Sequence, residues 1–389
     1  MARLILYTIL VSVTSNSYMF ASDWPQWRGL GGQGHSIDES LPVEWSEEKN
    51  VSWKVSISGR GWSSPVILND QIWLTSAEET LASEKETEER LKENTGSQPL
   101  TLLKSSRFFA ICIDKNSGKM IHKIQLFNVN NPQWVHRFNS YASPTPIIEN
   151  DKIYCHFGTY GTACVDINDG KVLWRNLVLK CMHENGPASC PVIYEDSIIF
   201  HMDGSDNQFI VAIDKNTGKV IWKTKRSGKM HDNPQLKKAY GTPVIARLHG
   251  RDIVVSPAAN WVYGYDPATG DELWRLEYGS LGFSIVPKPV IGNGMIYIGT
   301  SYMRPQMLGI DVSKPQPEIA WSCKRSVPAI SSPILIGEEL YFVSDSGGMV
   351  TCLDAKTGEE LWRERIGGNH GSSPTFVGGR ILFHSKEGE

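Results

Sequence analysis

One motif recurs along most of this chain and constrains its fold more than any other feature. Its best copy is Ala-Ile-Asp-Lys-Asn-Thr-Gly-Lys-Val-Ile-Trp at residues 212–222. Close copies end at Trp174, Trp274 and Trp362, and looser copies end at His122 and Trp321. The aspartates of the repeat, Asp114, Asp166, Asp214, Asp266, Asp311 and Asp354, are 52, 48, 52, 45 and 43 residues apart. Such a period indicates a repeat protein in which each unit holds about four short strands.

Each unit also opens with a Ser- or Thr-rich run and a proline, as at residues 63–66, 242–244 and 331–334. A polar turn and a second apolar run follow, which predicts two short strands. In the second half of the unit, the aspartate can cap a turn between two more strands, and the glycine takes the positive φ that this turn requires. One such unit leaves a face unburied, so neighbouring units must stack around an axis. The repeat therefore predicts an all-β fold, a β-propeller of four-stranded blades.

These residues also carry a family resemblance. The motif A-x-D-x-x-T-G-x-x-x-W resembles the tryptophan-docking repeat of the quinoprotein propellers, which bind pyrroloquinoline quinone (PQQ), over most of residues 51–389. The run Asp-Trp-Pro-Gln-Trp-Arg-Gly at residues 23–29 resembles the start of exported PQQ-binding-like repeat proteins, a group related in fold to the outer-membrane assembly lipoprotein BamB. The resemblance implies an eight-bladed ring.

The number of blades is open from the sequence. The chain starts seven blades and completes six, because only two strands of the seventh are predicted after Pro374. Two interpretations remain: an eight-bladed ring whose sequence is truncated at the C-terminus, or a seven-bladed ring with a three-stranded last blade. Residues 51–54 are similar to an outermost strand without its blade, so we expect Trp53 to close the ring beside the strands of residues 374–384.

The N-terminus predicts export. Arg3 precedes an apolar stretch over residues 4–13, too short to span a bilayer, so residues 1–21 are predicted to be a signal peptide. Residues 22–50 then form an N-terminal extension, and residues 51–389 the propeller. Since the first cysteine is Cys112, no lipid anchor is expected, and the mature protein is predicted to be a soluble periplasmic or cell-envelope protein. Its net charge of −3 excludes a general attraction to nucleic acid.

The seven cysteines include no C-x-x-C pair and are mostly interpreted as buried thiols. Cys155 and Cys164 would lie directly opposite each other if residues 158–161 turn a hairpin, which would bring them close enough for a disulfide.

The cofactor prediction follows from the resemblance. A catalytic quinoprotein is expected to have an adjacent Cys-Cys disulfide and acidic Ca²⁺ ligands, and its electron-transferring versions a C-x-x-C-H motif. This sequence has neither cysteine motif, so no cofactor is expected, with PQQ and Ca²⁺ as the alternative. Motifs for metal hydrolases, serine nucleophiles and phosphate loops do not occur. The tryptophans interpreted as docking residues between blades are Trp53, Trp174, Trp222, Trp274, Trp321 and Trp362.

Blade topology locates the candidate binding surface. The links that enter each innermost strand and the turns between the second and third strands emerge on one face, at the mouth of the central channel. Polar residues collect in these links: His136, Arg137, Asn139, His183, Glu184, Asn185 and His370. The acidic insert at residues 77–106, expected to include a solvated helix, and residues 201–203 are placed in links at the same mouth. Convergent polar groups predict a binding site, and locally bonded loop residues are the alternative.

Together these features predict a non-catalytic exported binding or scaffold protein of the cell envelope. Its ligand at the channel mouth is expected to be a small polar molecule or a partner protein. The alternative is a PQQ-dependent or other oxidoreductase acting on an alcohol or sugar, with His183 or Glu184 in acid–base chemistry. Alanine at Arg137 or Glu184 is expected to weaken ligand binding while leaving the melting temperature nearly unchanged.

Overall fold

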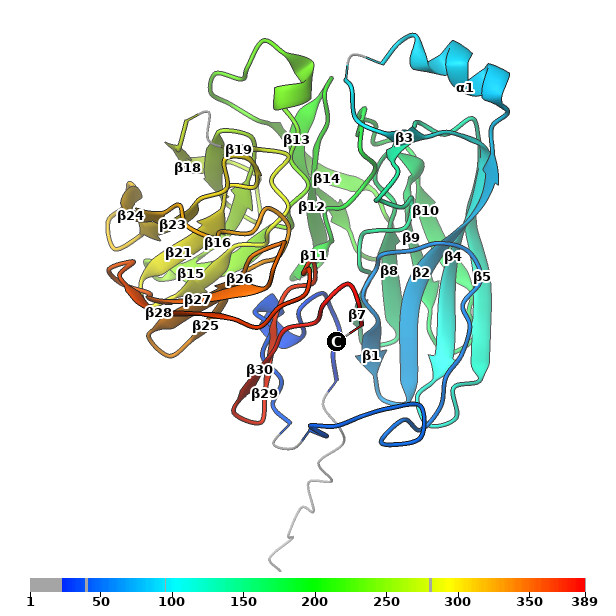
Figure 1. Cartoon of the computed structure of the whole chain (residues 1–389). Helices are drawn as coiled ribbons and strands as arrows, with labels where there is room; N and C mark the ends of the chain where they lie inside the picture. The colour runs from blue at the N-terminus through cyan, green and yellow to red at the C-terminus, as the bar shows by residue number, and fades with distance from the viewer. Residues whose placement is uncertain (1–22, 39–40, 95, 280–281, 389) are drawn as a thin grey trace, which may run out of the picture.

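The computed structural model describes residues 23–38, 41–94, 96–279 and 282–388. The predicted signal peptide lies outside these residues. The described chain is almost entirely β-structure, arranged as sheets around a central axis (Figure 1). Its helical segments are α1 (Glu84–Leu91) and the short 3-10 turns η1 (Leu30–Gly32), η2 (Gly158–Tyr160) and η3 (Pro234–Leu236). The predicted propeller fold is confirmed.

In the described residues, six antiparallel sheets have four strands each. The first three are β1 (Val66–Leu68), β2 (Gln71–Leu81), β4 (Leu103–Asp114) and β5 (Met120–Asn130); β7 (Ile147–Glu149), β8 (Lys152–His156), β9 (Thr162–Asp166) and β10 (Val172–Asn176); and β11 (Val192–Tyr194), β12 (Ser197–Asp203), β13 (Gln208–Asp214) and β14 (Val220–Lys225). The next three are β15 (Val244–Leu248), β16 (Arg251–Pro257), β17 (Trp261–Tyr265) and β18 (Glu272–Glu277); β20 (Val290–Gly292), β21 (Met295–Gly299), β23 (Met307–Asp311) and β24 (Glu318–Cys323); and β25 (Ile334–Ile336), β26 (Glu339–Val343), β27 (Met349–Asp354) and β28 (Glu360–Arg365).

Three two-stranded sheets complete the described architecture. They pair β3 (Leu100–Thr101) with β6 (Val135–His136), β19 (Gly282–Phe283) with β22 (Tyr302–Met303), and β29 (Thr375–Val377) with β30 (Arg380–Leu382). The β29–β30 hairpin begins a further blade, so the described sheets follow the predicted pattern of six complete blades and a partial one.

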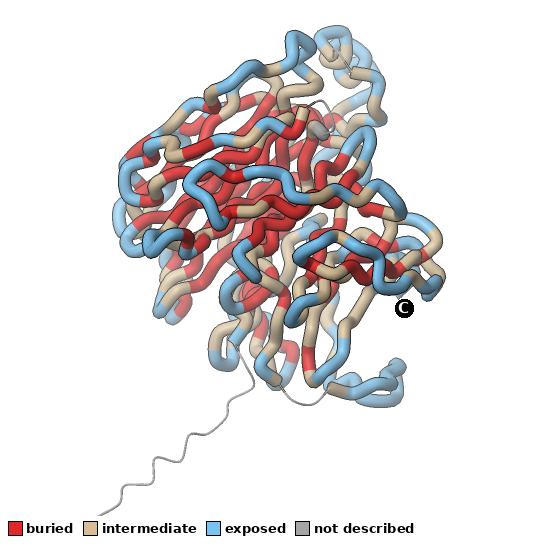
Figure 2. Tube along the Cα trace, turned by 90° about the vertical axis from the view of Figure 1, so that its left-hand side faces the viewer, coloured by how far each residue is buried: buried red, intermediate tan, exposed pale blue. Residues whose placement is uncertain are grey.

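The apolar core lies between neighbouring blades. All seven residues of β12 are buried, whereas four of the six residues of the outermost strand β14 are exposed and only Trp222 is buried. One cluster joins the third, fourth and fifth blades through residues such as Ile199, Val254 and Ile296. Figure 2 shows this buried interior and the exposed loops around it. Because each blade buries its faces against its neighbours, the position of one blade depends on the next.

The repeat motif forms the turn before each outermost strand. In the third blade, the Asp214 carboxylate accepts hydrogen bonds from the backbone N–H and the hydroxyl of Thr217, at 2.7 and 2.9 Å, and Gly218 has a φ of +70°. The tryptophan of the preceding blade packs on this glycine, and the Trp174 indole N–H donates to the Lys215 carbonyl at 3.0 Å. The same contact joins Trp222 to Pro267 at 3.0 Å, Trp321 to Ala355 at 3.1 Å and Trp53 to Lys115 at 2.8 Å.

Two of the predicted docking tryptophans lie differently. The turn after Asp311 has no glycine, and Trp274 is buried in the same apolar cluster as Val312. Trp362 is exposed and contacts Tyr341 of its own blade, with ring centroids 5.9 Å apart.

The expected pairing of Trp53 with the C-terminal hairpin is wrong. Trp53 packs on the first blade, on Gly118 and beside Ile111. The free edge of β29 is instead bonded by the N-terminal segment, where Ser36 N–H donates to the Phe376 carbonyl at 2.8 Å. The reason is strand order: β29 and β30 are the two inner strands of a blade, and an outermost strand can pair only with the third strand.

The residue before each opening proline has a role that the sequence did not reveal. Its side chain accepts a hydrogen bond from the backbone N–H at the equivalent position of the preceding blade. These bonds run from Ser64 to Thr145, from Thr145 to Cys190, from Cys190 to Thr242, from Lys288 to Ser332, and from Ser332 to Ser373, at 2.9 to 3.2 Å. We call these residues the inner ring. Lysine has no acceptor atom, so Lys288 cannot accept the equivalent bond from Thr242.

The N-terminal extension is built into the propeller. Residues 24–36 cross from one innermost strand to another, as the dark blue trace near β1, β7, β29 and β30 shows (Figure 1). Trp24 pairs with Ile67 of β1, and the Pro25 carbonyl accepts from the Ile148 N–H of β7 at 2.8 Å. On the other side, the His35 ring bonds the Leu335 carbonyl of β25 at 2.9 Å. The segment therefore ties the first blades to the last ones.

The acidic insert is shorter than its predicted bounds. β2 and β4 extend the first blade as far as Leu81 and Leu103, so only residues 82–102 leave the sheet. Within them, Ser83 and Glu86 form a capping box at the start of α1, which carries no buried residue. The expected solvated helix is therefore present at the top of Figure 1.

The expectation that Cys155 and Cys164 face each other is wrong. The η2 turn sets the register so that Cys155 pairs with Ala163 and Cys164 with Tyr154. Because side chains alternate between the two faces of a strand, the two thiols point into different cores. All seven cysteines are free thiols.

Candidate functional site

The two polar runs singled out in the sequence lie against each other in the structure. The Asn139 side-chain N–H donates to the Asn185 carbonyl at 2.7 Å, and the His136 backbone N–H donates to the same oxygen at 3.3 Å. These contacts join the link that enters the second blade to the link that enters the third. We call the six residues His136, Arg137, Asn139, His183, Glu184 and Asn185 the mouth cluster.

The acidic insert borders the mouth cluster. Leu100 of β3 pairs with His136 of β6, and the Arg137 N–H donates to the Pro99 carbonyl at 3.0 Å. The Gln98 amide lies 3.4 Å from the Asn185 side-chain oxygen. The returning arm of the insert therefore holds the backbone of the first polar run and contacts the Asn185 side chain of the second.

Glu184 is buried and fully engaged by its neighbours. Its two carboxylate oxygens accept from the Trp134 indole N–H at 3.0 Å and from the Ser205 hydroxyl at 2.9 Å. Its backbone has a φ of +65°, which is rare for a residue with a side chain. Burial lowers the pKa of the nearby Lys238 to about 8, while the Glu184 charge opposes that change.

His183 is also buried, and its imidazole is held in the neutral form. Its Nε2 accepts from the Thr159 backbone N–H at 3.0 Å, and its carbonyl accepts from the Tyr240 hydroxyl at 2.6 Å. Burial lowers the pKa of His183 to about 4. An imidazole whose acceptor nitrogen is bonded to a backbone amide orients the loop and is not presented to a substrate.

The exposed part of the site is aromatic and cationic. The Phe138 ring is 70% exposed, and the Arg137 guanidinium lies 4.9 Å from its centroid. The Arg60 guanidinium donates to the Arg137 carbonyl, and Trp62, two residues further on, is 61% exposed. We call Arg60, Trp62, Arg137 and Phe138 the rim.

His370 is separate from this site. It is buried, and its ring nitrogens lie 2.9 and 3.1 Å from the carbonyls of Gly367 and His384. These partners belong to the links around β29 and β30, so His370 fastens its own loop.

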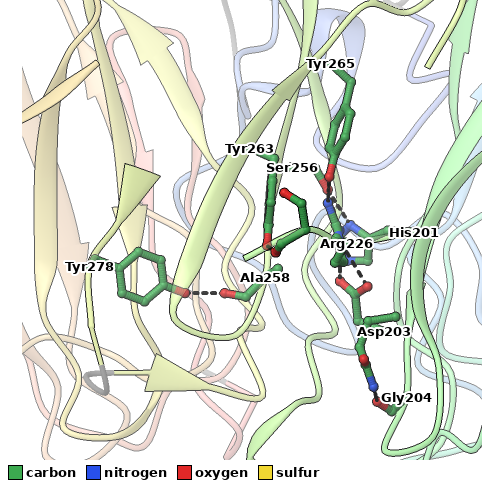
Figure 3. A network of polar contacts seen from close by, with 11 residues as sticks. His201, Asp203, Gly204, Arg226, Ser256, Ala258, Tyr263, Tyr265 and Tyr278 are labelled. Carbon is green, nitrogen blue, oxygen red and sulfur yellow. Dashed lines mark hydrogen bonds and ion pairs between the residues drawn. The ribbon is translucent and has the colours of Figure 1, made fainter. Parts of the chain in front are cut away.

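Residues 201–203 do not lie in a link, contrary to expectation. They belong to β12 and are fully buried. Asp203 forms an ion pair of 2.8 Å with Arg226, which also donates to Ser256 at 2.7 Å (Figure 3). His201 bonds the same Ser256 hydroxyl at 2.9 Å. Asp203 also forms a backbone bridge with Ala239, next to Lys238, so this buried network is connected to the link that enters the fourth blade.

The comparisons with known proteins agree with this architecture. A family model described as outer membrane protein assembly factor BamB matches residues 110–362 and 258–389. The chain belongs to this family. A search of curated proteins found no match.

Solved structures show the BamB family fold at low sequence identity. BamB from Moraxella catarrhalis is 17% identical with a TM-score of 0.54, covering 75% of this chain and 80% of that one. A quinohemoprotein alcohol dehydrogenase from Comamonas testosteroni is 12% identical with a TM-score of 0.57, covering 92% and 76%. One from Pseudomonas putida HK5 is also 12% identical, with a TM-score of 0.53 and coverage of 93% and 76%.

Two observations bear on the Ca²⁺ and PQQ considered from the sequence. Among the described residues, no three His, Cys, Asp or Glu side chains gather as metal ligands. The cysteines are free thiols, and no two of them are adjacent in the sequence as in the Cys-Cys platform expected of a catalytic quinoprotein. Within the same residues, no helix is both long enough and apolar enough to cross a membrane.

Sequence reasoning missed Arg226 and Lys238. Neither residue belongs to a recognisable motif. Both matter because their charged side chains are buried, which only the tertiary structure shows. The only local signal was Lys238 standing four residues before the Thr242-Pro243 opening of a blade.

Proposed function

We propose that this BamB-family propeller is a non-catalytic binding or scaffold protein of the cell envelope. Its binding site is the rim, supported from below by the mouth cluster. The observation that carries the proposal is that the buried polar groups of this site are bonded within the protein, whereas the exposed groups are aromatic and cationic. His183 and Glu184 are the candidate acid–base groups, and their side chains already accept hydrogen bonds from Thr159, Trp134 and Ser205. The exposed groups are instead the aromatic and guanidinium side chains of the rim.

The rim suits a partner segment that carries carboxylate and apolar groups. Guanidinium groups bind carboxylates in pairs of hydrogen bonds, and exposed aromatic residues are typical anchors of protein interfaces. Arg137 is positioned by its backbone bonds to the insert and to Arg60, and Phe138 by the bond from its backbone N–H to the His136 ring. A partner would therefore meet a rim that is already ordered, which reduces the entropy lost on binding.

The cell-envelope part of the proposal is supported by the predicted signal peptide and by the family description, which names outer membrane protein assembly. Expression of the full chain with its N-terminus and intact-mass measurement of the exported product would test it. Loss of about the first 21 residues is expected. A cytoplasmic product that retains Met1 would overturn the location.

The binding site can be tested by photo-cross-linking in intact cells. A photoreactive phenylalanine at position 138 is expected to give a discrete cross-linked species. The same probe at Ile221, which is 50% exposed on the outer strand β14, is the matched control. Arg137→Ala should reduce the cross-link at position 138 several-fold. Equal cross-linking at both positions, or no effect of Arg137→Ala, would contradict the assignment.

The same protein also tests the oxidoreductase alternative. Purified protein mixed with PQQ and Ca²⁺ is expected to show no absorbance from bound quinone and no alcohol-dependent reduction of a dye. Either signal would replace the scaffold proposal with an enzyme.

A further inference from the structure

Two cationic side chains are buried together at the centre of the ring. Arg28, from the N-terminal segment, is 4% exposed, and Lys288, from the inner ring, is 2% exposed. Both side chains pack closely on glycines of the N-terminal segment. A Cβ atom added at Gly32 would lie 2.1 Å from the Lys288 ammonium nitrogen, and one added at Gly34 would lie 2.7 Å from Arg28 Nη2. Both cations therefore face the same stretch of backbone.

Lys288 stands out against its equivalents in the other blades. The matching inner-ring residues are Ser64, Thr145, Cys190, Thr242, Ser332 and Ser373. All six are small and have a hydroxyl or thiol that the ring can use. A lysine at this position costs the ring one hydrogen bond and brings a positive charge to the axis, which the packing of the ring does not require.

The position of each cation is well defined. The Arg28 Nη2 donates to the Gln33 carbonyl at 3.1 Å, and the Gln33 side chain accepts from the Ile291 N–H of β20 at 3.1 Å. Lys288 is held by its backbone bond to Ser332, and its ammonium lies 5.8 Å from the centroid of the Trp27 ring. The N-terminal segment thus brings Arg28 to the blade that carries Lys288.

Among the described residues, the charge of this pair is not balanced. Arg28 Nε and Nη1 are buried and have no hydrogen-bond partner there. Burial lowers the pKa of Arg28 to about 9, and burial together with the Arg28 charge lowers the pKa of Lys288 to about 7. The Cys190 thiol is the group that acts in the opposite direction on Lys288.

Arg226 shows how the same fold treats a buried guanidinium that belongs to its own structure. That side chain also has no exposure, but Asp203 accepts from both its Nε and its Nη2, at 3.0 and 2.8 Å. Unpaired buried charges are costly, and buried cations in proteins are normally paired. Arg28 and Lys288 are buried in the same way, but among the described residues no carboxylate pairs with them to offset the free-energy cost of burial.

We propose that Arg28 and Lys288 form a binding site for a small oxyanion, a phosphate group or a carboxylate, on the axis of the propeller. An anion there would supply acceptors for unpaired N–H groups of Arg28 and for the ammonium of Lys288. Its charge would balance the pair, which is the role that Asp203 has beside Arg226. This site uses none of the rim or mouth-cluster residues, so it stands independently of the proposed partner site.

The test is thermal unfolding of the full mature protein with inorganic phosphate as the probe. Sodium chloride keeps the ionic strength constant, and acetate in a parallel series separates a phosphate site from a carboxylate site. The wild type is expected to gain about 3 °C in Tm when the bound oxyanion is present at a hundred times its Kd. Isothermal titration calorimetry should give one site per chain.

Two variants and a control decide the assignment. Lys288→Ser restores the residue type of the other blades, so it should fold, and it should lose the Tm gain and at least ten-fold in affinity. Arg28→Gln should do the same. Arg380→Gln, at an exposed arginine of β30, should keep the full response. The proposal fails if phosphate and acetate leave the wild-type Tm at its chloride value, or if Lys288→Ser responds as the wild type does.

Discussion

The contact between Trp222 and the turn of the next blade can be measured with a pair of glycine substitutions. Gly270 and Gly250 have the same φ of +77°. A Cβ atom at Gly270 would lie 2.4 Å from Trp222 Cε3, whereas a Cβ atom at Gly250 would meet nothing within 4 Å. Gly250→Ala therefore reports the backbone strain alone, and Gly270→Ala adds the displaced tryptophan.

The expected magnitudes follow from these distances. A left-handed alanine costs about 1–2 kcal/mol at either position. At Gly270, overpacking adds about 1–3 kcal/mol, and loss of the Trp222 hydrogen bond to Pro267 adds about 1 kcal/mol. The unfolding entropy of a chain of this length is about 0.8 kcal/mol/K. Gly270→Ala should therefore lower the Tm by about 3–5 °C more than Gly250→Ala does.

Differential scanning calorimetry of both variants provides the measurement. On a Trp222→Ala background, Gly270→Ala should cost the backbone strain and the adjustment of the Thr224 hydroxyl, 2.9 Å from the new Cβ, but no longer the displacement of the indole. If the two glycine variants lose the same Tm, or if the Trp222→Ala background does not reduce the cost at Gly270, the docking contact does not stabilise the ring as argued.

Three further predictions concern individual side chains. In buffer free of oxyanions, Lys288 should add a rise in stability of up to about 1.4 kcal/mol per pH unit between pH about 7 and about 10, because the unfolded chain binds a proton at Lys288 that the folded chain does not; the difference between the wild-type and Lys288→Ser urea unfolding curves isolates this rise from the titration of other buried groups. Glu184→Ala should lower the free energy of unfolding by about 1–3 kcal/mol, since it leaves the buried Trp134 N–H unpaired, while exposed Arg137→Ala should change it by under about 0.5 kcal/mol. This replaces the expectation that both variants melt like the wild type. Alkylation of the denatured, unreduced protein should add seven labels by mass spectrometry, and five or fewer would show an intrachain disulfide.

Local features were predictable from the sequence because they repeat. The turn at Asp214 depends on residues within four positions, so its capping and its positive-φ glycine could be inferred directly. The proximity of the mouth-cluster runs also followed from topology, since links of adjacent blades must emerge side by side. The ligand of these runs could not be predicted from topology, because the exposure and the hydrogen bonds of each side chain decide which polar groups are free to bind it.

The two errors have different physical causes. The register of Cys155 and Cys164 depends on the shape of a single turn, and a shift of one residue moves a side chain to the other face. The location of Trp53 depends on which strand edges are already bonded, and the N-terminal segment bonds the edge of β29. The location of Trp53 thus involves competition between distant segments, which a local pattern does not encode.

The sequence by itself determined the repeat, the class of fold and the docking chemistry, because these depend on residue types at fixed short spacings. Only the tertiary structure decided that Arg28 and Lys288, 260 positions apart in the chain, are buried in one place. Whether a buried charge or hydrogen-bond donor has a partner depends on all the residues that surround it in space, including residues far away in the sequence. The N-terminal segment and the inner ring supply those neighbours from opposite ends of the chain.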